Sequence, residues 1–304
     1  MKKLGLCLLT VCSAAASPDR TVQEGFRAST DAVIVDVSVR DGRRPVVNLT
    51  TRDFVLLDDG IPQEIDSVEV APTGLDLTVV MDVSGSASPF ASWILGGIRD
   101  VRALLLTEDR AELLTVGRQV RASTAPGDDV LRLSPPLIGD GGSHLFDSIT
   151  AAAMKTAEPG RRHLIVIFTD GLDTRSVIPA ETRDDVLRHS NAVIDLFAIS
   201  TSGRTNSSGV IYLGGPNAGT VETVGDYDYV LQSIADAAGG QFYAMRPGDK
   251  AASRLKETID LFRRHYLLRY RPVGVKSSGW HTLKVTVKSG RYEVVARRGY
   301  ERSR

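Results

Sequence analysis

The chain is poor in cysteine and in aromatic residues, and it carries no net charge. Only 2 of its 304 residues are cysteines, too few for a disulfide framework or a cysteine-rich zinc module. Lys and Arg number 37, as do Asp and Glu, so no overall positive field is available to hold nucleic acid or an anionic membrane. The hydrophobic share of 42% is ordinary for a globular protein and excludes a chain that is disordered throughout.

The chain has no hydrophobic run long enough to span a membrane, but a short one lies at its start. Lys2 and Lys3 precede the apolar residues 4–12 and the small residues 13–16. This order is typical of a secretory signal peptide, so residues 1–16 are expected to direct export to the periplasm or the extracellular space. A buried N-terminal helix or strand is the alternative. The run is shorter than the roughly 20 residues that span a bilayer, and no transmembrane segment is predicted elsewhere.

Both cysteines, Cys7 and Cys12, lie in the predicted signal peptide. Cleavage after Ala16 would leave a mature protein without cysteine, which excludes a thiol enzyme and a disulfide scaffold. Cys12 could instead accept a lipid, but Val11 before it is larger than the residue such processing usually requires. Lipid anchoring is therefore not expected.

Strand patterns occupy the two ends of what remains. Alternation of β-branched and polar residues with a period of two predicts half-buried strands, and Asp-Gly pairs predict the turns between them. The strands near the start are too few to be stable alone, so residues 24–71 and 265–302 are predicted to pair into one discontinuous antiparallel β-sandwich. The candidates are residues 32–40, 53–57 and 61–70 near the start and 266–271, 283–288 and 291–296 near the end.

The middle of the chain, residues 72–264, alternates apolar strand candidates with helical candidates. This pattern predicts an α/β fold, a doubly wound and mostly parallel sheet covered on both faces and inserted between the halves of the sandwich. Functional groups of such sheets lie past the carboxyl ends of the strands. The strand candidates are residues 75–81, 111–116, 164–168, 193–199 and 241–244, and the helical ones are 91–106, 144–157, 179–190, 228–238 and 249–264.

Three pieces at these strand ends carry oxygen ligands. The first middle strand ends at Asp82, and Ser84 and Ser86 follow in the same turn. A second strand ends in Asp170, and Ser143 lies in a Gly-rich loop that leads into a helix. Carboxylate and hydroxyl oxygens suit Mg²⁺, Mn²⁺ or Ca²⁺ rather than zinc or copper.

These residues resemble the metal-ion-dependent adhesion site of von Willebrand factor type A (VWFA) domains, whose pattern is Asp-x-Ser-x-Ser, then Thr, then Asp. The flanks also resemble a VWFA-related family of secreted bacterial proteins. The similar segments there are Leu49-Thr-x-x-Asp53-Phe54 before the domain and Tyr266-x-Leu268-x-Tyr270 with Arg298-Gly299-Tyr300 after it.

The resemblance implies a VWFA domain, Rossmann-like in fold, over residues 72–264 and a non-catalytic, adhesion-type function. The metal set would be Asp82, Ser84, Ser86, Ser143 and Asp170, holding Mg²⁺ or else Mn²⁺ or Ca²⁺. The cation would bridge to a Glu or Asp carboxylate of a protein ligand. Ser143 departs from the family Thr and lacks the methyl group that restricts χ1, so its oxygen should be less preorganised.

Other interpretations stay open. Asp82 to Ser86 could simply cap the helix that follows. The protein could be a structural envelope component whose metal site is vestigial. A metal-dependent phosphoester hydrolase is a weaker alternative, because aspartate-nucleophile phosphatases need a second Asp two residues after the first, where this chain has Ser84. No enzyme is expected.

Several further residues near these strand ends, and the histidines, have expected roles. Asp173 is expected to shape its loop rather than to bind metal, and Asp140 to serve turn geometry. The Gly- and Ser-rich segment 201–226 is expected to rise from the edge of the metal site and contribute to ligand contact, with disorder or a plain hairpin as alternatives. Five histidines show no metal-ligand spacing and are expected at the surface or at helix ends: His144, His163, His189, His265 and His281.

Overall fold

The computed structural model describes residues 32–70, 74–98, 101–123, 141–157, 160–199, 209–212, 221–224, 227–246 and 248–302. The predicted signal peptide, Cys12 and Asp140 lie outside these ranges, so those predictions stay predictions. Within the described ranges, the helices are all too short or too polar to cross a membrane.

A six-stranded sheet forms the centre of the middle region, in the order β13-β10-β9-β6-β7-β8. Strands β13, β10, β9, β6 and β7 run parallel, and β8 is antiparallel to β7 at one edge, so the sheet is mixed. Residues of the inner strands are buried on both faces, which fits their near-continuous apolar sequences. The strands are β6 (Gly74–Asp82), β7 (Arg110–Val116), β8 (Val120–Ser123), β9 (Arg161–Thr169), β10 (Val193–Ile199) and β13 (Phe242–Met245).

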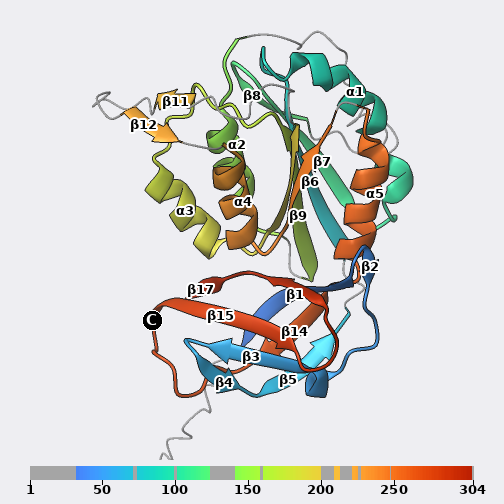
Figure 1. Ribbon diagram of the computed structural model, residues 1–304, viewed down its shortest axis with the longest axis vertical. Coiled ribbons are helices and arrows are strands. Elements are labelled where there is room, and N and C mark those ends of the chain that lie inside the picture. The colour runs from blue at the N-terminus through green and yellow to red at the C-terminus, as the bar shows by residue number, and fades with distance from the viewer. Residues whose placement is uncertain are drawn as a thin grey trace, which may run out of the picture. The chain divides into compact units, whose positions relative to one another are not determined.

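Helices cover both faces of this sheet (Figure 1). On one face α1 and α5 pack against Leu77, Val79 and Phe168. On the other, α2, α3 and α4 contribute to a second core with Val80 and Ile167. The helices are α1 (Ser88–Ile98), α2 (Leu145–Ala153), α3 (Ala180–His189), α4 (Tyr227–Ala237) and α5 (Ala251–Phe262), with 3-10 turns η1 (Thr51–Asp53) and η2 (Val101–Leu104).

The chain ends form two antiparallel sheets with a shared core. The order in one is β16-β1-β14-β5, with β2 beside β1, and in the other β17-β15-β3-β4. Strands from the two ends pair directly, because Val35 lies opposite Leu268 and Leu56 opposite Val285. The strands are β1 (Val33–Asp41), β2 (Arg44–Pro45), β3 (Phe54–Asp58), β4 (Ile61–Gln63), β5 (Ile65–Glu69), β14 (Tyr266–Tyr270), β15 (Gly279–Val287), β16 (Glu293–Ala296) and β17 (Gly299–Arg302).

Alternation explains which side chains fill this sandwich core. In β14 the side chains of Tyr266, Leu268 and Tyr270 are fully buried and the residues between them are not. Tyr266 meets Phe54 edge to face, with ring centroids 5.3 Å apart. A register slip of one residue would expose all of them, so the core fixes the pairing of the two ends.

One local expectation needs correction, and one alternative is decided. The helix predicted over residues 91–106 is shorter, because α1 ends at Ile98, just after Gly96 and Gly97, and a 3-10 turn follows. The segment 201–226 contains two short paired strands, β11 (Gly209–Tyr212) and β12 (Val221–Val224). Of the alternatives considered for it, the hairpin is therefore present; a role in ligand contact stays a prediction.

Candidate metal centre

The path of the chain through the sheet reverses between β6 and β9. From β6 the chain moves outward to β7, then returns to place β9 on the other side of β6 and continues to β10 and β13. Ligands of open α/β sheets bind outside the carboxyl ends of strands at such a switch point. Asp82 is the last residue of β6, and Asp170 directly follows β9. The two predicted carboxylates therefore lie on the neighbouring strands that flank the switch point.

Asp82 is held rigidly at this edge. Its side chain is 1% exposed. The Oδ1 atom accepts a hydrogen bond from the Ser84 backbone N–H at 3.0 Å, and Oδ2 accepts one from the Thr169 hydroxyl at 2.8 Å. Met81 and Phe168 are register partners, so Thr169 is placed beside Asp82 by strand pairing.

The turn after Asp82 brings the two predicted serines together. The hydroxyl oxygens of Ser84 and Ser86 lie 3.3 Å apart, with Ser84 buried and Ser86 exposed. The backbone N–H of Gly85 donates to the carbonyl of Gly141 at 3.0 Å. That bond joins the turn to the Gly-rich loop that carries Ser143.

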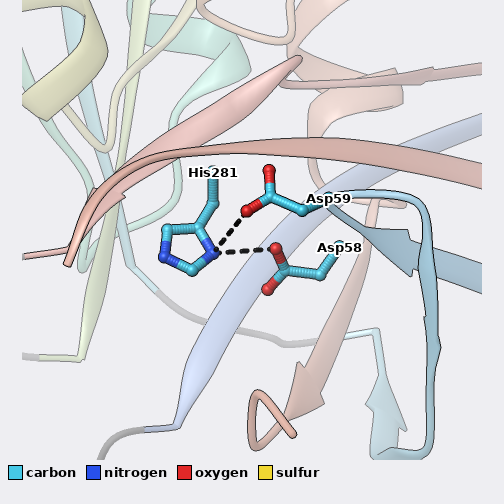
Figure 2. Close-up of side chains that lie close together, drawn as sticks. All are labelled: Asp58, Asp59 and His281. Atoms are coloured by element: carbon cyan, nitrogen blue, oxygen red, sulfur yellow. Dashed lines mark hydrogen bonds and ion pairs between the residues drawn. The ribbon is translucent and has the colours of Figure 1, made fainter. Parts of the chain in front are cut away.

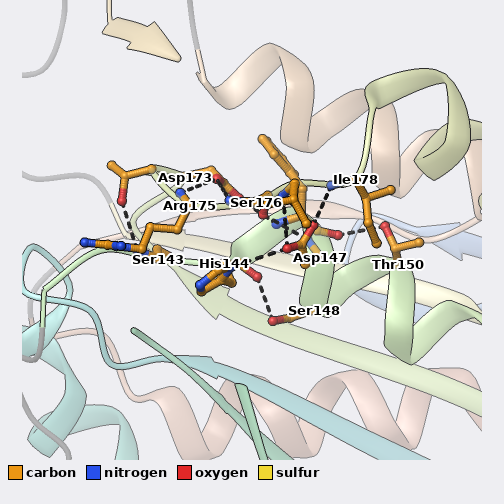
Figure 3. A network of polar contacts seen from close by, with 12 residues as sticks. Ser143, His144, Asp147, Ser148, Thr150, Asp173, Arg175, Ser176 and Ile178 are labelled. Atoms are coloured by element: carbon orange, nitrogen blue, oxygen red, sulfur yellow. Dashed lines mark hydrogen bonds and ion pairs between the residues drawn. The ribbon is translucent and has the colours of Figure 1, made fainter. Parts of the chain in front are cut away.

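Ser143 precedes α2, whose start is tied to the loop that follows Asp170 (Figure 3). The Ser143 N–H donates to the Thr174 hydroxyl, and its carbonyl accepts from the N–H groups of Thr174 and Arg175. Gly142 has no space for a side chain, since a Cβ there would lie 2.4 Å from Oγ1 of Thr174. The two loops pack so closely that the Ser143 position is fixed.

The free backbone N–H groups in the first turn of α2 are capped by side chains of the loop that follows Asp170. The N–H of Phe146 donates to Asp173 Oδ2 at 2.8 Å, and the N–H of Asp147 donates to the Ser176 hydroxyl at 3.0 Å. Asp147 in turn accepts from the backbone N–H of Ile178. Asp173 therefore shapes a loop, as expected, and satisfies helix donors that otherwise lack partners.

The set of oxygens fits a hard divalent cation. The Ser143 Oγ atom is buried and has no hydrogen-bond partner among the described residues. Burial, together with the charge of nearby Asp170, raises the pKa of Asp82 to about 6. A cation at this edge would supply the Ser143 oxygen with a partner and offset two buried negative charges.

The Asp170 carboxylate also shapes the local loop. Its Oδ1 atom accepts the N–H of Leu172 at 3.0 Å, and the residue is 6% exposed. Gly171 between them has φ +82°, a conformation that a side chain would strain. All five predicted ligands thus come from loops at one edge, and Thr169 is an additional residue there that the motif did not indicate.

A second group of potential ligands lies in the sandwich (Figure 2). Asp58, Asp59 and His281 each offer an atom within 4.8 Å of the others. His281 Nδ1 is 2.9 Å from Asp58 Oδ1 and 3.6 Å from Asp59 Oδ2. Asp58 and His281 are fully buried. The three residues form a possible metal-binding group.

Protein donors already engage this second group. Asp58 Oδ2 accepts from the hydroxyls of Tyr270 at 2.8 Å and Tyr300 at 3.0 Å, and its other oxygen faces His281. Asp59 Oδ1 accepts from the backbone N–H and hydroxyl of Thr282. A metal ion here would have to replace contacts that the protein makes itself.

The expectation for the histidines was wrong for two of the five, because His163 and His281 are buried within strands β9 and β15. His265 is also buried, but it lies at a helix end, where its backbone N–H donates to the carbonyl of Phe262, the last residue of α5. His281 shares the inward phase of β15 with Leu283 and Val285, a signal that the alternation already contained. His265 Nδ1 lies 2.6 Å from Asp36 Oδ1, and His163 is hydrogen-bonded to the Thr78 hydroxyl. These imidazole rings are hydrogen-bonded to residues of strands far away in the sequence, and local residue spacing does not reveal such partners.

No protein-family model matches the chain, and no curated protein matches it. Solved structures with some similarity include the conserved hypothetical protein BatB from Bacteroides thetaiotaomicron, at 15% identity and a TM-score of 0.44, over 62% of this chain and 98% of that one. An aerotolerance-related membrane protein from Bacteroides fragilis, with multiple mutations to serines, matches at 17% identity and a TM-score of 0.41, over 62% and 99%. A von Willebrand factor type A protein from Catenulispora acidiphila matches at 12% identity and a TM-score of 0.43, over 84% and 74%. These values assign no function to the chain.

Proposed function

We propose that the protein is an exported, non-catalytic protein-binding module of the VWFA type. A divalent cation, Mg²⁺ or else Mn²⁺ or Ca²⁺, binds at the carboxyl edge of the parallel strands and bridges to an acidic residue of a protein ligand. The metal set is Asp82, Ser84, Ser86, Ser143 and Asp170. The observation that carries this proposal is the placement of these residues, at the ends of β6 and β9 and in the loop before α2, at the switch point of the sheet.

The open part of the coordination shell explains why such a site would take an acidic ligand. Three of the five groups are neutral hydroxyls, so the protein supplies two formal negative charges to a cation of charge two, and part of the coordination shell is left to solvent or a ligand. Ser86 is exposed, which keeps one side of the group open. A carboxylate of the protein ligand would occupy the open coordination position, on the exposed side of the group near Ser86.

Two features of the described residues argue against a hydrolytic site. Asp82 is hydrogen-bonded on both oxygens, to the Ser84 N–H and the Thr169 hydroxyl, which restrains it as a nucleophile. The histidine nearest in sequence to Ser143, His144, pairs with Asp147 at 3.3 Å on the helix. The arrangement is therefore better suited to binding a ligand through a metal ion than to hydrolysing a substrate.

Calorimetric titration with MgCl₂, MnCl₂ and CaCl₂ tests the metal part. The full chain should bind at least one of these ions, and Asp82→Asn should abolish binding while keeping the size of the side chain. Asp59→Asn is the matched control, because it makes the same change, a carboxylate oxygen to an amide nitrogen, in the group of Asp58, Asp59 and His281. Loss of binding in Asp59→Asn alone would place the ion in the sandwich and refute the proposed site.

The ligand part needs its own probe. With the metal at saturation, glutarate should bind to the wild-type chain as a carboxylate probe and should not bind to Asp82→Asn. Absence of any Asp82-dependent metal binding would instead favour a structural envelope protein with a vestigial site. Asp82-dependent turnover of p-nitrophenyl phosphate would contradict the non-catalytic assignment.

A further inference from the structure

A cavity of about 250 Å³ lies beside α5, and no residue of the proposed metal set lines it. Its walls come from the end of β1, from the β1–β2 turn, from β10 and β13, and from one side of α5. The lining residues are Arg40, Arg43, Phe197, Tyr243, Arg254, Glu257, Thr258 and Leu261. The volume lies near the lower end of the range for small-molecule sites, roughly 300 to 1,000 Å³.

Arginine dominates the charge of this cavity. Arg43 lies 3.4 Å and Arg254 3.2 Å from opposite oxygens of the Glu257 carboxylate, so one acid is shared by two guanidinium groups. Arg40 pairs through one terminal nitrogen with Glu293. Three arginines thus face two carboxylates in this group, and the buried Asp195 nearby is a further acidic group that interacts with Arg40.

Arg40 supplies a second and independent observation. Its side chain is 11% exposed, and its buried Nε–H has no acceptor among the described residues. A buried donor left without an acceptor loses the hydrogen bond that it would make to water in the unfolded chain. An oxyanion in the cavity would provide that acceptor, and a planar guanidinium is suited to binding two oxygens at once.

One wall is aromatic. The Tyr243 ring stacks on Phe197, with centroids 4.8 Å apart and planes at 14°, and Phe197 stacks on Phe168 at 5.0 Å. The Tyr243 hydroxyl donates to Gln241 Oε1 at 2.8 Å, which holds the ring in place. Tyr243 and Leu261 give the cavity an apolar surface beside the arginines.

A neighbouring cavity of about 350 Å³ makes a useful contrast. It shares Arg43, Glu257 and Leu261, but Lys256 and Asp260 in its wall pair with each other. Its other charged groups are Arg43 and Arg264 against Glu257, so this cavity also holds an excess of one positive charge. The Arg40 Nε–H, which has no acceptor among the described residues, and the aromatic wall therefore distinguish the cavity at Arg40 and Tyr243.

We propose that this cavity binds a small oxyanion, a carboxylate or a phosphate ester with an apolar or aromatic body, through Arg40, Arg43 and Arg254. Glu257 occupies the arginines when no ligand is bound and competes with it. The site is separate from the metal centre and does not depend on the proposed adhesion function.

Calorimetric titration of the full chain without divalent ions, using benzoate and phenyl phosphate at constant ionic strength, tests the site. Saturable binding of either supports the proposal, and the stronger of the two identifies the oxyanion. Glu257→Gln should tighten binding, because it removes the competing charge while keeping side-chain size. Arg43→Gln and Arg254→Gln should each weaken it about fivefold, the effect of one exposed charge pair.

Arg271→Gln is the matched control, because Arg271 is an exposed arginine that pairs with Asp66 and does not line the cavity. Its affinity for either probe should equal that of the wild type. Equal weakening in Arg271→Gln would mean nonspecific charge attraction and would overturn the proposal. Failure of both probes to bind wild type and Glu257→Gln would do the same, and circular dichroism of each variant checks its fold.

Discussion

Asp195, in the middle of β10, should make the stability of this protein fall as the pH rises. Burial raises the pKa of Asp195 to about 6 from 3.8. The Gln241 N–H, at 2.7 Å from Oδ1, and the charges of His265 and Arg40 oppose this rise, whereas the charge of Asp36 adds to it. The protonated carboxyl is therefore favoured in the folded chain.

The direction follows from proton counting. Between pH 3.8 and about 6 the folded state holds the Asp195 proton while the unfolded state has lost it. The contribution of Asp195 to stability is complete below pH 3.8 and is lost as the pH rises through about 6. A difference of about 2 in pKa corresponds to about 3 kcal/mol, at about 1.4 kcal/mol for each pH unit.

Asp195→Asn isolates this effect, because Asn keeps an oxygen for the Gln241 N–H and never ionises. Near pH 4 the variant and the wild type should be about equally stable, and at pH 7.5 the variant should be more stable by up to about 3 kcal/mol. Urea unfolding of both proteins at several pH values measures the difference, in which other titrating groups cancel.

Asp185→Asn serves as the control, because Asp185 is exposed on α3 with a side chain 65% accessible. Its effect should stay within about 0.5 kcal/mol at every pH. A stability difference for Asp195→Asn that does not change between pH 4 and 7.5 would show that the buried carboxyl is not the cause. A difference that shrinks with rising pH would reverse the assigned direction.

Three further substitutions have definite expected outcomes. Asp36→Asn should lower the free energy of unfolding by about 3 kcal/mol in urea, because it leaves the largely buried Arg162 guanidinium without its anion. Ser143→Ala should change stability without metal by less than about 0.5 kcal/mol, since Oγ has no partner among the described residues, yet weaken Mg²⁺ or Mn²⁺ binding at least tenfold by calorimetry. Tyr270→Phe should destabilise by about 1.5 to 3 kcal/mol in the same urea assay, because a hydrogen bond to the Asp58 carboxylate is lost.

Much of the fold was predictable because its signals are local. The alternation in residues 33–41 and 266–270 set the buried faces of β1 and β14, and the apolar runs at β6, β9 and β10 predicted strands covered on both sides. The antiparallel β8 was not predicted, because its four residues carry too short a pattern to be distinguished from a loop.

The cavity and the buried histidines could not be predicted from the sequence, for a different reason. Arg40 and Arg254 are more than 200 residues apart in sequence, and only the packing of α5 beside the end of β1 brings them to one space. The same holds for Asp58 and His281, which strand pairing between β3 and β15 places together. The spacing of residues along the sequence does not show which distant residues become neighbours in the fold.

The two acidic groups differ in what the protein itself supplies, and that difference decides where a cation should bind. Asp58 is buried, but two tyrosine hydroxyls and His281 Nδ1 surround its oxygens, so its charge already has partners. Asp82 is also buried, and burial together with the charge of Asp170 raises its pKa to about 6 despite the hydrogen bonds from Ser84 and Thr169. The unbalanced charge therefore lies at the strand ends of β6 and β9. A divalent ion should bind there in preference to the sandwich group, even though the sandwich group has the more familiar combination of two carboxylates and an imidazole.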